Sequence, residues 1–171
     1  MSYFNQFSTI LYDPAGDGSA KLCTDIMSRV RIRTNMKKEI VMLDTYAVKE
    51  NETPEIVADK HHGSPYYHWV VMLLNDISDV NHDWVKSTRQ LQRYLQDKYT
   101  EAQLSETHHY EMSQTSGDTT VKIEVENSTY PSASAVTNYE YEVALNESKR
   151  QIDLLRNDYL TFFVDEFQSL I

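Results

Sequence analysis

The segment from Thr53 to Asp76 constrains the fold of this chain most strongly, because it carries start and stop signals for two consecutive helices. Thr53 is a good N-cap, Pro54 suits the first helical position and Gly63 suits a helix end, after which Ser64 and Pro65 repeat the start signal. The second helix, predicted over residues 65–74, is apolar around almost its whole circumference, through Tyr66, Tyr67, Trp69, Val70, Val71, Met72, Leu73 and Leu74. Such a helix must lie in a core or an interface, so it is a packing element rather than a catalytic one.

Extended segments are predicted on both sides of the two helices. Residues 44–49 (DTYAVK) alternate as in a strand, and residues 49–52 (KENE) predict a polar turn. Residues 75–81 (NDISDVN) predict a turn followed by a short extended piece. The predicted order is therefore strand, helix, helix, strand.

This order, with its aromatic-valine strand, Thr or Pro helix start and Asn-rich exit, resembles the LysM module. More specifically, residues 46–76 resemble the LysM-like segment of the baseplate wedge protein family of contractile-tailed bacteriophages, through Gly63, Pro65, Trp69, Asn75 and Asp76. Supporting matches lie outside this block, at Thr24, Asp25 and Ile26, at residues 82–87 (HDWVKS) and at residues 146–152 (NESKRQI). The resemblance covers roughly two thirds of the chain, and the segment 108–126 matches no family motif.

The remaining segments predict further elements. Ser87 is a plausible N-cap for a helix over residues 88–99, and residues 109–113 and 121–126 flank a TSGDTT turn and predict a hairpin. Residues 127–134 predict a polar linker. Residues 138–171 contain neither Gly nor Pro and predict one long closing helix. Val30 to Arg33 and Ile40 to Leu43 could add strand pairing around the module.

The fold class expected from these elements is α+β. It comprises a small LysM-like βααβ module with an N-terminal arm, a β-hairpin insertion and a long C-terminal helix. The expected division of the chain is an arm and basic segment over 1–40, the module over 41–86, a helix with an acidic hairpin over 87–137 and the long helix over 138–171.

The resemblance implies a structural subunit of a phage tail baseplate wedge, which joins neighbouring wedge proteins during assembly. The implied partners are other wedge proteins, namely the sheath-like initiator subunit and the large wedge scaffold subunits, in multiple copies around a six-fold axis. The implied location is the virion tail baseplate, after synthesis in the host cytoplasm.

An alternative function is a LysM-type module that binds peptidoglycan, with a groove lined by residues 51–53 and 75–79. The absence of an export signal at the N-terminus and the scarcity of glycine in the loops argue against it. A third possibility, a cell-wall hydrolase, lacks a catalytic pattern. Glu52, Glu55 and Asp59 lie on a turn and a helix face, where carboxylates are usually solvated. We therefore expect no enzyme activity and no cofactor.

Charge and composition narrow the possible partners. The net charge of −10 argues against binding to nucleic acid or to an anionic membrane, and no apolar run is long enough to span a bilayer. The single Cys23 excludes an internal disulfide. Basic residues concentrate between positions 19 and 40, whereas nine acidic residues and only Lys122 lie between 100 and 147, which suits assembly with charged partners. The histidines at 61, 62, 68 and 82 lack zinc-site spacing, so no metal is expected.

Aromatic residues are the interface candidates, because the arm over residues 1–13 and the closing helix carry more apolar groups than a small module needs. The candidates are Phe4, Phe7, Tyr66, Tyr67, Trp69, Trp84, Tyr159, Phe162, Phe163 and Phe167. Two alternatives remain open for them: the arm packs on its own domain, or the closing helix breaks and packs back on its own core.

Overall fold

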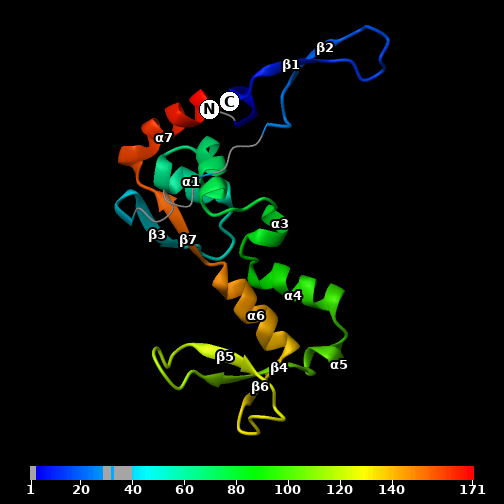
Figure 1. Cartoon of the computed structure of the whole chain (residues 1–171), viewed down its shortest axis with the longest axis vertical. Coiled ribbons are helices and arrows are strands. Elements are labelled where there is room, and N and C mark those ends of the chain that lie inside the picture. Colours follow the sequence, from blue (N-terminus) through cyan, green and yellow to red (C-terminus); the bar gives the residue numbers. More distant parts are fainter. Residues whose placement is uncertain (1–2, 29–31, 33–39) are drawn as a thin grey trace. The chain divides into compact units, whose positions relative to one another are not determined.

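The computed structural model describes residues 3–28, 32 and 40–171, and it divides into two compact units (Figure 1). Unit 1 consists of the chain up to Trp84 together with Gln151–Ile171, and unit 2 consists of Val85–Arg150. Unit 2 is thus inserted into the sequence of unit 1. The model contains both helices and strands, which confirms the α+β class.

Unit 1 contains two small sheets and several helices. Its short strands and 3-10 turns are η1 (Tyr3–Gln6), β1 (Thr9–Tyr12), β2 (Lys21–Thr24), η3 (Ile40–Met42), β3 (Leu43–Ala47) and β7 (Gln151–Leu155). Its helices are α1 (Pro54–His62), η4 (Pro65–Tyr67), α2 (His68–Leu74), α3 (Val80–Asp83) and α7 (Asn157–Leu170). Val30, Arg31 and Arg33, part of a predicted strand pairing, lie outside the described residues.

The helix signals of the central segment are confirmed. The Thr53 side chain accepts a hydrogen bond from the Ile56 N–H, and α1 ends at Gly63, whose φ of 72° is the left-handed conformation that glycine adopts without strain. Ser64 then caps η4, which leads directly into α2. The second predicted helix therefore exists, with a 3-10 first turn.

The prediction of a second strand directly after the two helices, in the βααβ order, is wrong. Residues 75–81 form no strand; the antiparallel partner of β3 is β7, in a register that pairs Leu43 with Leu155 and Ala47 with Gln151. Residues after α2 instead form a turn, with Asp76 at a φ of 55°, and the short helix α3. The strand that completes this sheet follows the whole of unit 2 in the sequence.

The Asn75 side chain makes the hydrogen bonds to β7 that a neighbouring strand would otherwise make. Its Nδ2 donates to the Asp153 carbonyl at 2.8 Å, and its Oδ1 accepts from the Asp153 N–H at 2.9 Å. Nδ2 also donates to the Val71 carbonyl at 2.8 Å. One amide side chain thus satisfies the backbone of β7 on the edge that faces away from β3.

The prediction of one long helix over residues 138–171 is also wrong. The segment forms α6 (Asn138–Ser148), β7 and α7. Ile152 and Leu154 alternate with exposed Gln151 and Asp153, the period of a strand with one buried face. The spacing of Ile152, Leu155 and Tyr159 also fits a helix, and neither Gly nor Pro marks the break.

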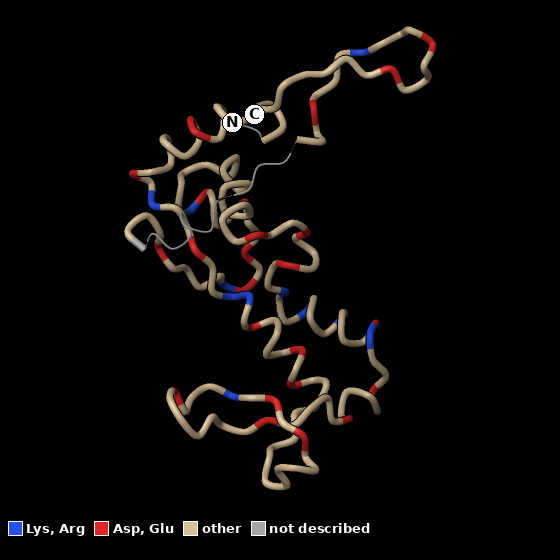
Figure 2. The backbone as a smooth tube through the Cα atoms, viewed as in Figure 1, with Lys and Arg blue, Asp and Glu red and all other residues tan. Residues whose placement is uncertain are grey.

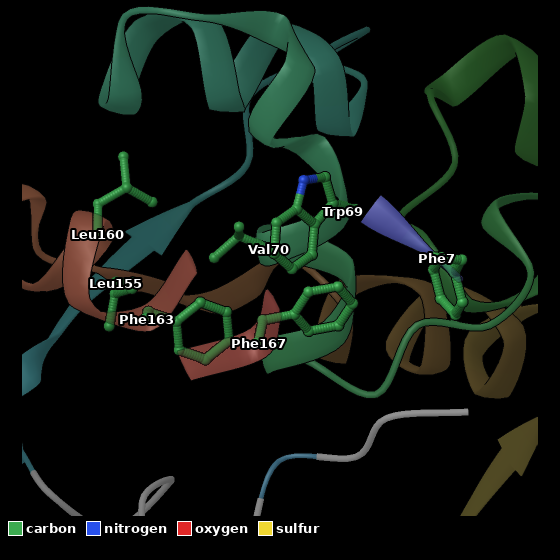
Figure 3. Packing of buried hydrophobic residues seen from close by; sticks show 7 residues of the cluster. All are labelled: Phe7, Trp69, Val70, Leu155, Leu160, Phe163 and Phe167. Carbon is green, nitrogen blue, oxygen red and sulfur yellow. The ribbon is translucent and has the colours of Figure 1, made fainter. Parts of the chain in front are cut away.

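The core of unit 1 lies where α2, β7 and α7 meet (Figure 3). Its buried members are Phe7, Trp69, Val70, Leu155, Leu160, Phe163 and Phe167. The ring centroids of Trp69 and Phe167 lie 4.6 Å apart, and those of Trp69 and Phe163 lie 6.1 Å apart. Such aromatic pairs add about 0.5–1.5 kcal/mol each beyond their area burial.

Unit 2 combines three helices with one sheet. Its elements are α4 (Thr88–Lys98), α5 (Glu101–Leu104), β4 (Thr107–Ser113), β5 (Lys122–Val125), β6 (Ser134–Thr137) and α6. The predicted helix after Ser87 and the predicted hairpin are confirmed, the former with a full capping box to Gln90. The third strand, β6, was not predicted; it pairs with β4, so that the strand order is β5-β4-β6.

No helix among the described residues is long and apolar enough to cross a membrane.

Candidate protein-protein interface

Half of the ten aromatic candidates are buried inside unit 1. Phe7, Trp69, Phe163 and Phe167 belong to its aromatic core, with exposed fractions of 7%, 4%, 7% and 2%. Trp84 is buried as well, and its Nε1 donates to the Glu52 carbonyl at 2.8 Å. Both alternatives left open by the sequence hold here: the arm packs on its own unit through Phe7, and the closing segment breaks and packs back on the core through α7.

The other five candidates lie at or near the surface. Phe4, Tyr66 and Phe162 are 56%, 60% and 65% exposed. Tyr67 and Tyr159 are partly buried and pack against the aromatic core. The structure therefore brings Phe4, Tyr66 and Phe162 to the surface of unit 1 as aromatic side chains that a partner could contact.

The β1–β2 hairpin carries a larger set of exposed apolar groups, which the list of aromatic candidates missed. Leu11 and Leu22 are paired across the two strands and are 74% and 68% exposed. Ile10 and Tyr12, 40% and 55% exposed, point to the opposite face, because side chains alternate along a strand. Among the described residues, this sheet has only these two strands. The sequence signal that could have found this surface was the set of aliphatic residues in TILY and KLCT, whereas the candidates were chosen by aromatic residue type.

The polar turn between β3 and α1 is held by a buried carboxylate. Glu52 accepts hydrogen bonds from the Tyr46 hydroxyl at 2.9 Å, from the Lys49 N–H at 2.8 Å and from Lys60 Nζ at 2.5 Å. Burial alone would raise the pKa of Glu52, but the hydrogen bonds from Lys60, Lys49 and Tyr46 together lower it. The expectation that the carboxylates of this segment are all solvated is therefore wrong for Glu52.

The surroundings of Glu52 suit a structural role. A carboxylate that is already paired with Lys60 and two other donors, with a lowered pKa, is poorly suited to act as a general acid or base near neutral pH. The side-chain hydrogen bond to Glu52 in turn raises the pKa of Lys60. Glu52 thus fixes the turn that connects β3 to α1.

A second buried carboxylate organises unit 2. Glu142 on α6 is 3% exposed and accepts hydrogen bonds from Lys98 Nζ at 2.5 Å and from the Tyr99 hydroxyl at 3.0 Å. The bond to Glu142 is the main reason why the pKa of Lys98 is raised. Farther along α6, Asn146 binds the Lys86 N–H and carbonyl at 2.8 and 3.0 Å. Polar contacts therefore connect α6 to α4 and to the segment before it.

Two histidines of the central segment hydrogen-bond to the end of β7 and the start of α7, which lie far away in the sequence. His61 Nε2 lies 3.0 Å from the Leu155 carbonyl oxygen, and His62 Nδ1 lies 2.9 Å from Asn157 Oδ1. Burial lowers the pKa of His62. Within residues 3–28, 32 and 40–171, no three His, Cys, Asp or Glu side chains are grouped so that they could hold a metal ion.

Comparison with protein families gives one match. The family model described as Base plate wedge protein 53 matches residues 16–130. A comparison with curated proteins finds no significant match. The matched range begins in the turn between β1 and β2, includes α1 and α2, and ends shortly after β5. Because this range is well over half of the 171 residues, the chain belongs to the Base plate wedge protein 53 family, whose place is the tail baseplate of a bacteriophage virion.

Proposed function

We propose that this structural baseplate protein joins neighbouring wedge proteins during baseplate assembly. By resemblance, its partners are the sheath-like initiator subunit and the large wedge scaffold subunits, in a six-fold arrangement. The family match supports the baseplate role, and it gives no support to a peptidoglycan-binding module.

The observation that carries this proposal is the β1–β2 hairpin. All four residues of β1 and three of the four residues of β2 are exposed, although most of them are apolar. Within the part of the chain that the structure describes, this sheet has only two strands, and an isolated two-stranded hairpin is marginally stable in water. A protein partner that covers Leu11, Leu22 and Tyr12 would remove apolar surface from water and would order the hairpin at the same time.

Exposed side chains elsewhere on unit 1 support the same conclusion. Phe162 lies on α7 beside the buried Phe163, and Tyr66 lies on η4. Large aromatic side chains are enriched at protein interfaces because they bring a rigid apolar body with little loss of conformational entropy. Phe162 is therefore the second point at which we propose contact with a wedge protein.

The experiment compares baseplate assembly by the wild-type chain and by a variant whose hairpin lacks the paired Leu11 and Leu22. Leu11→Ser with Leu22→Ser removes the exposed leucines, and Thr9→Ser with Thr24→Ser on the same hairpin face is the matched control. The purified variants are mixed with the wedge proteins of the same phage, and joined wedges are counted by electron microscopy and sedimentation. We expect the leucine variant to leave wedges unjoined and the threonine variant to join them. Normal joining by the leucine variant would contradict the proposal.

A pull-down on insoluble peptidoglycan tests the alternative function. A wedge-joining subunit is expected to stay in the supernatant together with the wedge proteins. Specific retention on the glycan would favour the LysM-type binding module instead.

A further inference from the structure

Hydrogen bonds of two histidines join the end of α1 to the end of β7 and the start of α7. His61 Nε2 lies 3.0 Å from the Leu155 carbonyl oxygen. His62 Nδ1 lies 2.9 Å from Asn157 Oδ1, and Asn157 Nδ2 donates to the His61 carbonyl at 2.7 Å. The joined residues are 94 to 96 positions apart in the sequence. We call these three contacts the histidine clasp.

The orientation of the Asn157 amide fixes the hydrogen on His62. Since Asn157 Nδ2 donates to the His61 carbonyl, its Oδ1 is the atom that faces the ring of His62. An amide oxygen only accepts hydrogen bonds, so His62 Nδ1 must carry the hydrogen between the two atoms. In a neutral imidazole the other nitrogen then carries none. His62 Nε2 is therefore an acceptor without a hydrogen.

This Nε2 atom has no hydrogen-bond partner in the part of the chain that the structure describes, and it is buried. Protonation of His62 takes place at Nε2, because Nδ1 already carries its hydrogen. It would create a positive charge and an N–H donor at a buried position without an acceptor, which is costly. The neutral ring thus fits the histidine clasp, and the charged ring does not.

The charged groups on the neighbouring elements are engaged elsewhere. Lys, Arg, Asp and Glu residues lie on and beside both α1 and α7 (Figure 2). At the start of α7, Arg156 Nη2 lies 3.6 Å from Asp158 Oδ2, and on α1 Lys60 is paired with Glu52. Asp59, one turn before His62 on α1, is exposed to water, which screens its charge. None of these groups supplies the buried acceptor that a charged His62 needs.

The nearest titratable rings also disfavour the charged form. Burial is the largest cause of the lowered pKa of His62, the bond to Asn157 opposes it, and the charge of His61 lowers the pKa further. The ring centroids of the two histidines lie 4.8 Å apart, and that of Tyr67 on η4 lies 6.0 Å from His62. On α2, His68 acts on Glu55. The surroundings therefore hold His62 neutral.

We propose that the histidine clasp is a pH-sensitive joint, in which protonation of His62 in mildly acidic solution releases the start of α7 from α1. The inference goes beyond the proposed wedge-joining function and does not depend on it, because it concerns contacts within unit 1. Opening of the clasp loosens the helix that carries exposed Phe162 and buried Phe163 and Phe167. Mild acid thus changes the surface that α7 offers to a partner.

The direction of the effect follows from proton linkage. With the clasp open, His62 has the ordinary histidine pKa of 6.5, whereas burial lowers the pKa in the closed clasp. Above that pH the closed clasp is fully favoured. As the pH falls below it, the open form takes up a proton first, so its population rises. The rise is at most about tenfold per pH unit, until the pH reaches the pKa of the closed form.

Nitrogen NMR of the imidazole of His62 in the full-length chain tests the geometry. At pH 7.5 we expect the hydrogen on Nδ1, and on acidification we expect a titration midpoint below the ordinary value of 6.5. A hydrogen on Nε2, or a midpoint at or above 6.5, would overturn the proposal. This measurement uses the wild type and therefore needs no variant that folds.

Hydrogen exchange between pH 7.5 and pH 5.5 tests the opening. After correction for intrinsic exchange rates, the protection of amides 161–164 in α7 should fall by up to about tenfold per pH unit. His62→Gln cannot take up the proton and should remove this dependence. His68→Gln, in the same segment, is the matched control and should keep it. A wild type without the dependence, or a His62 variant that retains it, would overturn the proposal.

Asn157→Asp provides a test in the opposite direction. The substitution places a carboxylate opposite His62 Nδ1, and an opposite charge favours the protonated imidazole. The NMR midpoint of His62 should therefore rise above that of the wild type, and the loss of protection in α7 on acidification should become smaller. An unchanged midpoint would show that Asn157 does not face His62, and the histidine clasp would then be rejected.

Discussion

At the scale of single residues, neighbours in the sequence have opposite environments. Phe162 is 65% exposed, whereas Phe163 is 7% exposed and packs against Trp69. The helical period places them on different faces of α7, but the sequence does not say which of the two faces the core. The aromatic candidates could therefore be found from their residue type, but only the structure shows which of them are buried in the core and which are exposed.

Replacement of these two phenylalanines should separate folding from assembly. Phe163→Ala is expected to lower the free energy of unfolding by about 3–5 kcal/mol, because it leaves a cavity in the aromatic core. Phe162→Ala should change it by less than about 0.5 kcal/mol. Urea unfolding followed by circular dichroism measures both. A large loss of stability in the Phe162 variant would place that side chain in a core and remove it from the interface.

The buried carboxylate Glu52 gives a prediction about pH. Glu52→Gln should lower the free energy of unfolding by about 1–3 kcal/mol at pH 7, since the charge-assisted bond with Lys60 is lost. The folded-state pKa of Glu52 lies below its ordinary value of 4.5. Its contribution is therefore fully present above that pH and disappears as the pH falls through the folded-state pKa.

Urea unfolding between pH 3 and pH 7 checks this prediction. The difference between wild type and the Glu52 variant should shrink at the acid end of the series. Asp59→Asn on the exposed face of α1 is the control, and its effect should be small at every pH. A difference for Glu52→Gln that is independent of pH would show that packing, and not charge, stabilises the turn.

At the scale of secondary-structure elements, local signals predicted α1, α4 and the β4–β5 hairpin. Each has its own marker in the sequence: a Thr53 or Ser87 cap, a Gly63 terminus, or alternation around a turn. β7 has no such marker, and its Ile152 and Leu155 fit a helical period as well as they fit a strand. The strand exists because β3 offers it hydrogen bonds and α2 covers it, and neither contact is local.

The clamp on the outer edge of β7 can be tested by Asn75→Ala. The substitution leaves the N–H and carbonyl of Asp153 without the partner that Asn75 provides. We expect a loss of about 1–3 kcal/mol in the free energy of unfolding and faster hydrogen exchange at the Asp153 amide. Ser148→Ala, outside β7, should leave that amide unchanged. Unaltered exchange at Asp153 in the Asn75 variant would show that β3 alone holds the strand.

At the scale of the whole molecule, the two units differ in how much they bury. Most of the buried apolar residues belong to unit 1, whereas unit 2 contributes Val85 and Leu95. Unit 2 depends more on polar contacts, such as those of Glu142 with Lys98 and Tyr99. Because hydrophobic burial supplies most of the stability of a domain, unit 2 should be the weaker of the two.

Hydrogen exchange measured by mass spectrometry tests this difference. Amides of β4, β5 and β6 should exchange faster in the free chain than those of α2 and β7. Equal protection of both sheets in the free chain would contradict the prediction.

The sequence by itself determined the capped helices α1 and α4, the β4–β5 hairpin and the family. Caps, a glycine terminus and turn residues act within a few positions of one another, so Thr53 to Asp76 could be interpreted without the rest of the chain. Only the tertiary structure decided that β3 pairs with β7 and that Phe163 and Phe167 enter the core. These features depend on contacts between residues far apart in the chain, whose free energy comes from burial and strand pairing that no local pattern encodes.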